Sequence, residues 1–331
     1  MQWHNAEYGL VDPYGGKNDL KDKIIRCVGN PDTRFNEDAL RILRALRFAS
    51  VYGFSIEENT SKSIFKNADL LKNIATERVI SEFLKLICGK DAVKILDAYR
   101  ETIAVIIPEI TVMFNFNQNN IHHSYDLWQH TLTALGTIEP NPILRMTMLL
   151  HDIGKPSVKT TDNSGQSHFQ GHQLESKKIA DRILHRLRLP SDFINKTLLL
   201  IEYHDVRFNG SKKLMKKVMN VLGTDLTKQL LEVEYADISA QSEYQREEKL
   251  GYLKTAKTHL NEIIKDNECF KLSQLDIKGK DVLNLGVKEG RDVGNILDYL
   301  LMLVVDANVP NKKSILISKA KEYIYGNQIN K

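Results

Sequence analysis

Imidazole and carboxylate side chains recur through the middle of this 331-residue sequence in an order suited to binding divalent metal ions. The candidates are His130, His151, Asp152, His172, His204 and Asp237. Each lies on or at the end of a segment with helical periodicity, and ligands contributed by several helices of a bundle commonly form a metal site. A single histidine on a helix is more often a hydrogen-bonded core residue, so it is the order of the whole set that favours a metal site.

Helical periodicity supplies the elements that position these side chains. From Asn36 almost to the C-terminus, apolar residues recur at i, i+3 and i+4. We predict helices near 37–52, 58–66, 76–89, 91–101, 124–138, 142–153, 171–188, 191–204, 213–222, 225–264, 288–305 and 311–325. Residues 2–12 alternate weakly and lead into a turn rich in proline and glycine, which predicts a short strand. The predicted fold class is all-α with a small N-terminal β remnant.

Composition is that of a globular protein, with 27% charged and 42% apolar residues. The longest apolar runs are too short to span a bilayer, so we expect no membrane association. The N-terminus lacks the basic start and apolar stretch of a signal peptide. Three isolated cysteines, Cys27, Cys88 and Cys269, form no CxxC pair, which favours a reducing cytoplasm.

Basic clusters on predicted helices leave two interpretations open. One cluster is Lys212, Lys213, Lys216 and Lys217, and another is Lys312, Lys313, Lys319 and Lys321. Each cluster either contacts a phosphate backbone or is an ordinary solvated helix face.

Acidic and arginine side chains share one face of a helix that we predict from Asn36 to Ser50, with Asn36 as its N-cap. Glu37, Asp38, Arg41 and Arg44 lie opposite an apolar stripe. These four either form ion pairs along the helix or present a carboxylate acceptor and a guanidinium donor to a nucleobase.

Residues 12–54 resemble the neck of bacterial class II tRNA nucleotidyltransferases and the related poly(A) polymerases. The family pattern of DPFGG, KxIR and EDxxRxxRxxRFA occurs here as Asp12–Gly16, Lys23–Arg26 and Glu37–Ala49. The resemblance implies that Asp38 and Arg41 pair with the base of CTP or ATP, supported by Glu37 and Arg44. Residues 75–87 resemble the helix that follows in the family, with Glu77 and Arg78 at its motif positions.

The order of the histidines and aspartates, and the string HDIGK, resemble the HD phosphohydrolase superfamily. The resemblance implies that His130, His151, Asp152 and Asp237 hold one divalent ion (Mg, Mn, Ni or Co). It also implies that His172 and His204 hold a second ion, with Asp152 bridging and Lys155 meeting a phosphate. The implied reaction is hydrolysis of a phosphomonoester or of a 2′,3′-cyclic phosphodiester. An inert helical bundle is the alternative.

Other histidines are secondary candidates in this resemblance. His168 is a rival to His172, which has the GHxxxS spacing of the family. Gln118, Asn120 and His123 match the QxNxxH stretch that introduces the domain. Three further histidines, His122, His185 and His259, are interpreted as surface residues.

The catalytic head of the family carries two carboxylates spaced DxD, which hold magnesium, and this sequence contains no DxD. We therefore expect the head to be missing, whether by a shortened gene, by design, or because a separate chain supplies it. The chain alone is then expected to bind tRNA without adding nucleotides. Two alternatives are a free-standing phosphohydrolase and a non-catalytic tRNA-binding fragment.

Residues 275–324 resemble the C-terminal segment that touches the tRNA elbow in the family, although Arg291 and Asp292 depart from its usual proline step. Four domains follow from these comparisons. They are a remnant of the head (1–30), a neck and body that bind nucleotide and RNA (31–113), an HD metal domain (114–245) and a tRNA-binding tail (246–331).

Overall fold

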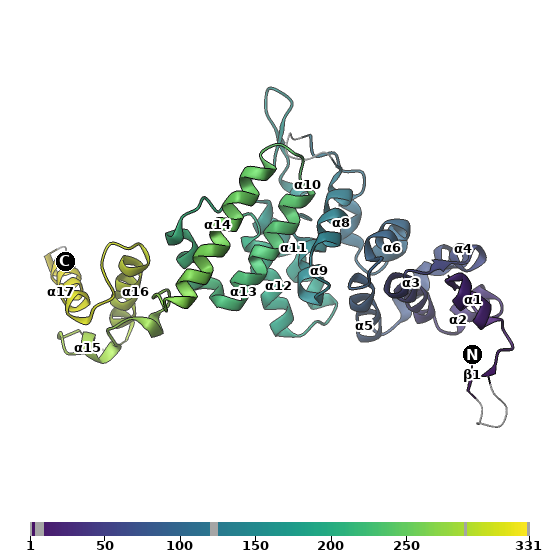
Figure 1. Ribbon diagram of the computed structural model, residues 1–331, viewed down its shortest axis with the longest axis horizontal. Helices are drawn as coiled ribbons and strands as arrows, with labels where there is room; N and C mark the ends of the chain where they lie inside the picture. Colours follow the sequence, from purple (N-terminus) through teal and green to yellow (C-terminus); the bar gives the residue numbers. More distant parts are fainter. Residues whose placement is uncertain (1, 4–9, 120–124, 288–289, 330–331) are drawn as a thin grey trace. The chain divides into compact units, whose positions relative to one another are not determined.

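The structure, a computed structural model, describes residues 2–3, 10–119, 125–287 and 290–329 (Figure 1). Helices dominate, which confirms the predicted fold class. The chain forms two compact units, one of Met1–Asp205 with Glu232–Arg246 and the other of Val206–Leu231 with Glu247–Lys331. The four predicted domain boundaries remain predictions.

Short strands flank the first helices. β1 (Gln2–Trp3) pairs antiparallel with β2 (Leu10–Val11), and β3 (Ile24–Ile25) pairs parallel with β4 (Ser55–Ile56). The Asp12 carboxylate accepts hydrogen bonds from the backbone N–H groups of Gly16 and Lys17, at 2.8 and 2.7 Å. These bonds close the glycine-rich turn and start α1 (Gly16–Asp22).

The predicted helix from Asn36 to Ser50 is wrong in its N-terminal part. The structure has two helices here, α2 (Pro31–Glu37) and α3 (Leu40–Tyr52). The Asn30 side chain caps α2 by accepting the Thr33 N–H at 3.2 Å, and proline fits the first helical position. Asp38 is extended, with φ −153° and ψ 99°, and its Oδ1 accepts the Leu40 N–H at 3.2 Å. An aspartate that bonds nearby backbone in this way interrupts a helix, so Asn36 is not a cap.

The remaining helices of this region are α4 (Glu58–Asn67), α5 (Thr76–Ile87), α6 (Ala92–Ala98) and α7 (Arg100–Ala104), with 3₁₀ turns η1 (Ala68–Asn73) and η2 (Pro108–Met113). Helices α5 and α6 pack against α3, and α4 packs against α2. The predicted apolar stripe is buried, since Ile42, Leu43 and Leu46 are each 0% exposed. Helix α3 packs against α5 beside Gly89, and the Ser50 hydroxyl donates to the Leu86 carbonyl at 2.7 Å.

A helical bundle follows in the same unit. It contains α8 (Leu127–Thr137), α9 (Pro142–Leu150), α10 (Lys155–Val158), α11 (His172–Arg186) and α12 (Ser191–Tyr203). The C-terminal part of α13 (Lys212–Ala240) completes it. Between α10 and α11, β5 (Thr160–Thr161) and β6 (Ser167–His168) form an antiparallel hairpin that the periodicity did not predict.

The second unit contains the first part of α13, then α14 (Arg246–Lys265), η3 (Leu272–Gln274), α15 (Gly279–Leu283), α16 (Arg291–Val305) and α17 (Lys313–Ile329). Helix α13 is interrupted at Gly223, whose φ of 71° and ψ of 177° are not helical. The predicted helix near 225–264 is therefore two helices, because α13 ends at Ala240 and α14 begins at Arg246.

Acidic partners neutralise the first lysine cluster within the second unit. Lys212 and Lys216 pair with Glu268 at 2.5 and 2.7 Å. Lys213 and Lys217 pair with Asp306 at 3.0 and 3.1 Å. These four ammonium groups therefore form ion pairs that stabilise the packing of α13 within the second unit. Their charge is largely neutralised, which disfavours the interpretation as a phosphate-binding cluster. Among the described residues, no helix is long and apolar enough to cross a membrane.

Replacing Gly89 by alanine is expected to destabilise the first unit by about 1–3 kcal/mol, because overpacking strains a close helix contact. A Cβ at this position would lie 2.1 Å from Ser50 Oγ and 2.6 Å from the Ser50 carbonyl carbon. The matched control is Gly251→Ala in α14, where no atom lies within 4 Å of the added Cβ. That control should be neutral or stabilising by up to about 1 kcal/mol. Chemical denaturation measures both, and equal effects of the two substitutions would contradict the close contact.

Candidate metal centre

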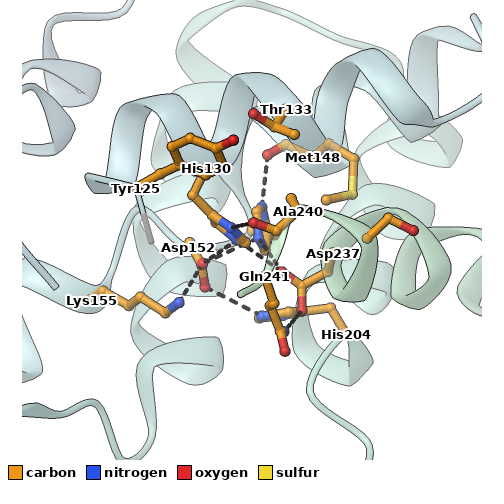
Figure 2. Close-up of polar contacts among 12 residues, drawn as sticks. Tyr125, His130, Thr133, Met148, Asp152, Lys155, His204, Asp237, Ala240 and Gln241 are labelled. Atoms are coloured by element: carbon orange, nitrogen blue, oxygen red, sulfur yellow. Dashed lines mark hydrogen bonds and ion pairs between the residues drawn. The ribbon is translucent and has the colours of Figure 1, made fainter. Parts of the chain in front are cut away.

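Helix ends bring the six predicted ligands into one region of the bundle. His151 follows the last residue of α9, His204 follows the last residue of α12, and His172 is the first residue of α11. His130 is the fourth residue of α8, near its N-terminal end, and Asp237 lies one turn before the end of α13. Figure 2 shows the side chains of His130, Asp152, His204 and Asp237 pointing toward one another from these separate elements.

The structure gathers the six residues into two groups that share one carboxylate. His130, His151, Asp152 and Asp237 each offer a ligand atom within 4.8 Å of the others, and Asp152, His172 and His204 do the same. Asp152 therefore lies between the groups. His130 and His151 are 0% exposed and Asp152 is 1% exposed, so bulk water does not screen these charges.

A backbone carbonyl fixes the outer nitrogen of each histidine ring. His151 Nδ1 lies 2.7 Å from the Met148 carbonyl, and His204 Nδ1 lies 2.7 Å from the Ile201 carbonyl. The corresponding distances are 2.9 Å for His172 to Phe169 and 3.3 Å for His130 to Ala240. A carbonyl only accepts, so Nδ1 carries the hydrogen and a neutral ring presents the lone pair of Nε2 to the centre. Metal-ligating histidines show this arrangement.

The inner nitrogens then face other acceptors. His130 Nε2 lies 2.9 Å from Asp237 Oδ1, and His172 Nε2 lies 3.1 Å from His204 Nε2. Among the described residues, no partner meets His151 Nε2 or either Asp152 oxygen with hydrogen-bond geometry, although ion-pair distances are short. Nitrogen and oxygen lone pairs that converge without hydrogen bonds between them are better explained by a site for a divalent cation than by a hydrogen-bond network.

Electrostatics keep both carboxylates charged. Burial alone raises the pKa of Asp152, but His151 and Lys155 hold this pKa well below its usual range. Burial likewise raises the pKa of Asp237, and the neighbouring His130 and His151 rings lower it well below that range. Burial lowers the pKa of His151, yet Asp152 and Asp237 raise it to about 10. Without a cation, His151 is therefore protonated at neutral pH.

Lys155 is buried beside the shared carboxylate. Its Nζ lies 2.6 Å from Asp152 Oδ2 and donates to Gln118 Oε1 at 3.2 Å. Gln118 is 1% exposed, and its Nε2 donates to the Tyr125 carbonyl at 3.3 Å. Gln118 therefore supplies part of the wall of the site. Asn120, His122 and His123 lie outside the described residues.

Close backbone contact brings α11 to Asp152. The Gly154 N–H donates to Ser176 Oγ at 2.9 Å, and a Cβ on Gly154 would lie 2.5 Å from the Ser176 nitrogen and 2.8 Å from the His172 carbonyl oxygen. Only glycine fits this approach, which sets His172 Nε2 at 3.2 Å from Asp152 Oδ1.

The secondary histidines lie apart from both groups. His168 pairs with Asp162 at 2.7 Å on the exposed β5–β6 hairpin, so it is not a rival ligand in this arrangement. His185 is exposed and pairs with Asp181 at 3.2 Å. His259 is partly buried in the second unit, where its Nε2 lies 3.0 Å from the Gly210 carbonyl.

Glu234 is a buried carboxyl near the centre that the sequence analysis missed. It is 5% exposed, and it precedes Asp237 by one turn of α13. Burial, Asp237 and Asp205 raise the pKa of Glu234 well above its usual value. Its spacing of three residues from Asp237 was the available signal, since residues at i and i+3 share a helix face.

The predicted nucleotide-binding residues lie around the break between α2 and α3. Glu37 contacts Arg34 at 2.8 Å and Arg41 at 3.7 Å. Asp38 pairs with Arg78 of α5 at 3.3 Å, a partner that the sequence analysis did not assign to it. Arg44 is exposed, and no ion pair engages it within the described part of the chain.

Two family models match this chain. The one described as "Probable RNA and SrmB-binding site of polymerase A" matches residues 53–114, and a tRNA nucleotidyltransferase domain 2 matches residues 172–320. The CCA-adding enzyme of Ligilactobacillus salivarius is 28% identical over 95% of this chain and 67% of its own length. The A-adding tRNA nucleotidyltransferase of Deinococcus radiodurans is 32% identical over 60% of this chain and 48% of its own.

A solved structure shows the same fold. The CCA-adding enzyme of Bacillus stearothermophilus in complex with CTP superimposes with a TM-score of 0.68 and 21% identity, over 97% of this chain and 70% of that chain. The sequence and fold comparisons agree, and this chain is similar to class II tRNA nucleotidyltransferases along most of its length. It spans about two thirds of the length of the L. salivarius relative and about half of the D. radiodurans relative.

Binding of Mn²⁺ or Ni²⁺ is expected to release a proton at pH 8, because His151, with a pKa of about 10, must become neutral to ligate. Affinity should therefore rise with pH up to that value. Calorimetry in buffers of different ionisation enthalpy measures the number of protons released. Asp152→Asn should abolish tight binding, since it removes the charge shared by both groups. Asp162→Asn on the exposed hairpin is the control, and equal binding by the two variants would contradict the assigned site.

Proposed function

We propose that this chain acts in tRNA 3′-end processing as the part of a CCA-adding type nucleotidyltransferase that binds tRNA and the nucleotide base, and that it also carries a metal-dependent phosphohydrolase site. The observation that carries the hydrolytic part is the pair of buried ligand groups sharing Asp152. The named activities of the L. salivarius and D. radiodurans relatives support the tRNA part. The substrate of the metal centre is a phosphomonoester or a 2′,3′-cyclic phosphodiester.

A bound divalent ion would lower the pKa of its water from about 16 to about 7 and polarise a phosphoryl oxygen. His130, His151, Asp152 and Asp237 would hold one ion, and His172 and His204 would hold a second one together with the shared Asp152. Lys155 would contact a phosphate oxygen, because its ammonium is anchored beside Asp152 and carries the complementary charge. In the cyclic ester, water oxygen forms a bond to phosphorus, one ring P–O bond breaks, and the freed ribose oxygen takes a proton.

The neck would recognise the base of CTP or ATP. Asp38 offers a carboxylate acceptor, and Arg41 offers guanidinium donors one helical turn later. Glu37 orients Arg41 across a 3.7 Å contact, and Arg78 orients Asp38. The exposed Arg44 would support the nucleotide through its free donors.

In the tail, tRNA phosphates would meet the second lysine cluster. Lys313 pairs with Asp281 at 2.8 Å and Lys319 pairs with Glu322 at 2.6 Å. Lys312 and Lys321 are exposed, and within the described residues no carboxylate pairs with either. The missing head, a separate chain that supplies it and a cytoplasmic location remain predictions.

Hydrolysis of 2′,3′-cyclic AMP in the presence of Mn²⁺ or Ni²⁺ tests the hydrolytic proposal. Asp152→Asn is expected to lower kcat/KM by more than roughly 100-fold, since changes around metal ligands alone cost 10–100-fold. Asp162→Asn should retain wild-type activity. Wild-type protein that binds the ion but leaves the cyclic ester and phosphomonoesters intact would show that the bundle is an inert scaffold.

Binding of fluorescent CTP and ATP analogues tests the neck. Arg41→Ala is expected to weaken binding by roughly tenfold, because it removes charge-assisted hydrogen bonds. Arg41→Lys should weaken binding nearly as much, because lysine keeps the charge but lacks the planar fork of donors. Lys62→Ala, which removes an exposed lysine paired with Glu58, is the control. Unchanged affinity in both Arg41 variants would refute the assigned role.

A further inference from the structure

Two phenylalanine rings lie beside the candidate metal centre and have no part in the ligand set. Phe169 precedes His172 by three residues, and Phe116 precedes Gln118 by two. Their ring centroids are 6.2 Å apart, and the ring planes are tilted by 58°. Both side chains are only partly buried, so each keeps some surface available to a ligand.

Phe169 is tied to a metal ligand through its backbone. Its carbonyl accepts both the backbone N–H of His172 at 3.1 Å and the ring Nδ1–H of His172 at 2.9 Å. The position of the phenyl ring therefore follows from the geometry that orients the ligand. A substitution of the Phe169 side chain leaves both of these backbone-acceptor bonds in place.

The face of the Phe169 ring is turned toward Lys155, which lies beside the candidate metal centre. Lys155 Nζ lies 5.6 Å from its centroid, over the ring. The same ammonium lies 2.6 Å from Asp152 Oδ2, the carboxylate shared by both ligand groups. One lysine head group thus lies between the aromatic face and the place where a phosphate would be attacked.

Phe116 carries a second cation. Lys159 Nζ lies 4.9 Å from the Phe116 centroid and donates to the Asn117 carbonyl at 2.9 Å. No carboxylate pairs with Lys159 among the residues that the structure describes. Its positive charge is therefore not neutralised by a neighbour, and it remains available to an anionic ligand.

We propose that Phe169 and Phe116 form a platform for the base of a nucleotide whose phosphate lies at the metal centre. Aromatic faces stack on any base, and nearby lysines meet the phosphates, which is the combination that binds single-stranded nucleic acid. The platform would therefore favour a phosphoester attached to a base, in a mononucleotide or at an RNA 3′ end, over the same phosphoester without a base. This inference rests on the hydrolytic function proposed above.

The test compares 2′,3′-cyclic AMP with glycerol 1,2-cyclic phosphate, which has the same reacting group but no base. Phe169→Leu keeps an apolar side chain and removes the aromatic face. It is expected to raise KM for 2′,3′-cyclic AMP by roughly tenfold and to leave kcat/KM for the glycerol ester unchanged. Phe169→Tyr should restore the wild-type KM, and Phe65→Leu in α4, outside the bundle, is the matched control. An equal loss on both esters would overturn the platform.

Binding of adenosine 3′-monophosphate, measured by calorimetry, tests base stacking on the platform independently of turnover. Wild-type protein should bind it roughly tenfold more tightly than glycerol phosphate, and Phe169→Leu should remove the difference. If wild-type protein hydrolyses neither ester, the hydrolytic function fails, and this binding difference still supports or overturns the platform. An RNA that ends in a 2′,3′-cyclic phosphate is assayed in parallel with the mononucleotide. A lower KM for the RNA would identify the RNA 3′ end as the preferred substrate.

Discussion

The carboxylate of Asp152 is the group on which the bundle depends. It lies beside His151, His172 and His204, and Lys155 contacts it at 2.6 Å. A buried anion without compensating charge is costly, so the surrounding helices must bring positive or cation-binding groups to it. This requirement explains why helix ends, rather than helix middles, converge there. A helix end places both a side chain and its backbone carbonyls near the same point.

Histidine rings and anionic aspartates together give the centre its preference for a cation. Each ring donates Nδ1–H to a carbonyl, so its Nε2 is oriented toward the centre before any ion arrives. Such pre-orientation reduces the cost of binding, since no ring must turn. The neck uses a different principle, in which pairs such as Asp38 with Arg78 hold polar groups at a break between helices.

Much of this architecture follows from sequence patterns, because helical periodicity and the HDIGK string are local signals. The helical class is confirmed, and the six ligand candidates lie together. Two features depended on contacts between distant residues and were not predicted. Gln118 reaches Lys155 across 37 residues, and acidic partners neutralise Lys212 and its neighbours. The start of the neck helix at Asn30 rather than Asn36 is a local feature, which the alternative cap at Asn36 concealed. Spacing along one segment cannot report which partner a side chain meets from another segment.

The close backbone contact at Gly154 limits the substitutions that the protein can accept during evolution. The hydrogen atom that stands in place of a side chain lets the turn after α9 touch the first turn of α11. Ion affinity can therefore be lost by a substitution that alters no ligand and no charge, simply by separating His172 from Asp152. Because a bound ion stabilises the folded state by mass action, such a change would also loosen the bundle. The presence of the ligand residues in a relative is consequently insufficient to infer that the relative binds an ion. The position equivalent to Gly154 must also be free of a side chain.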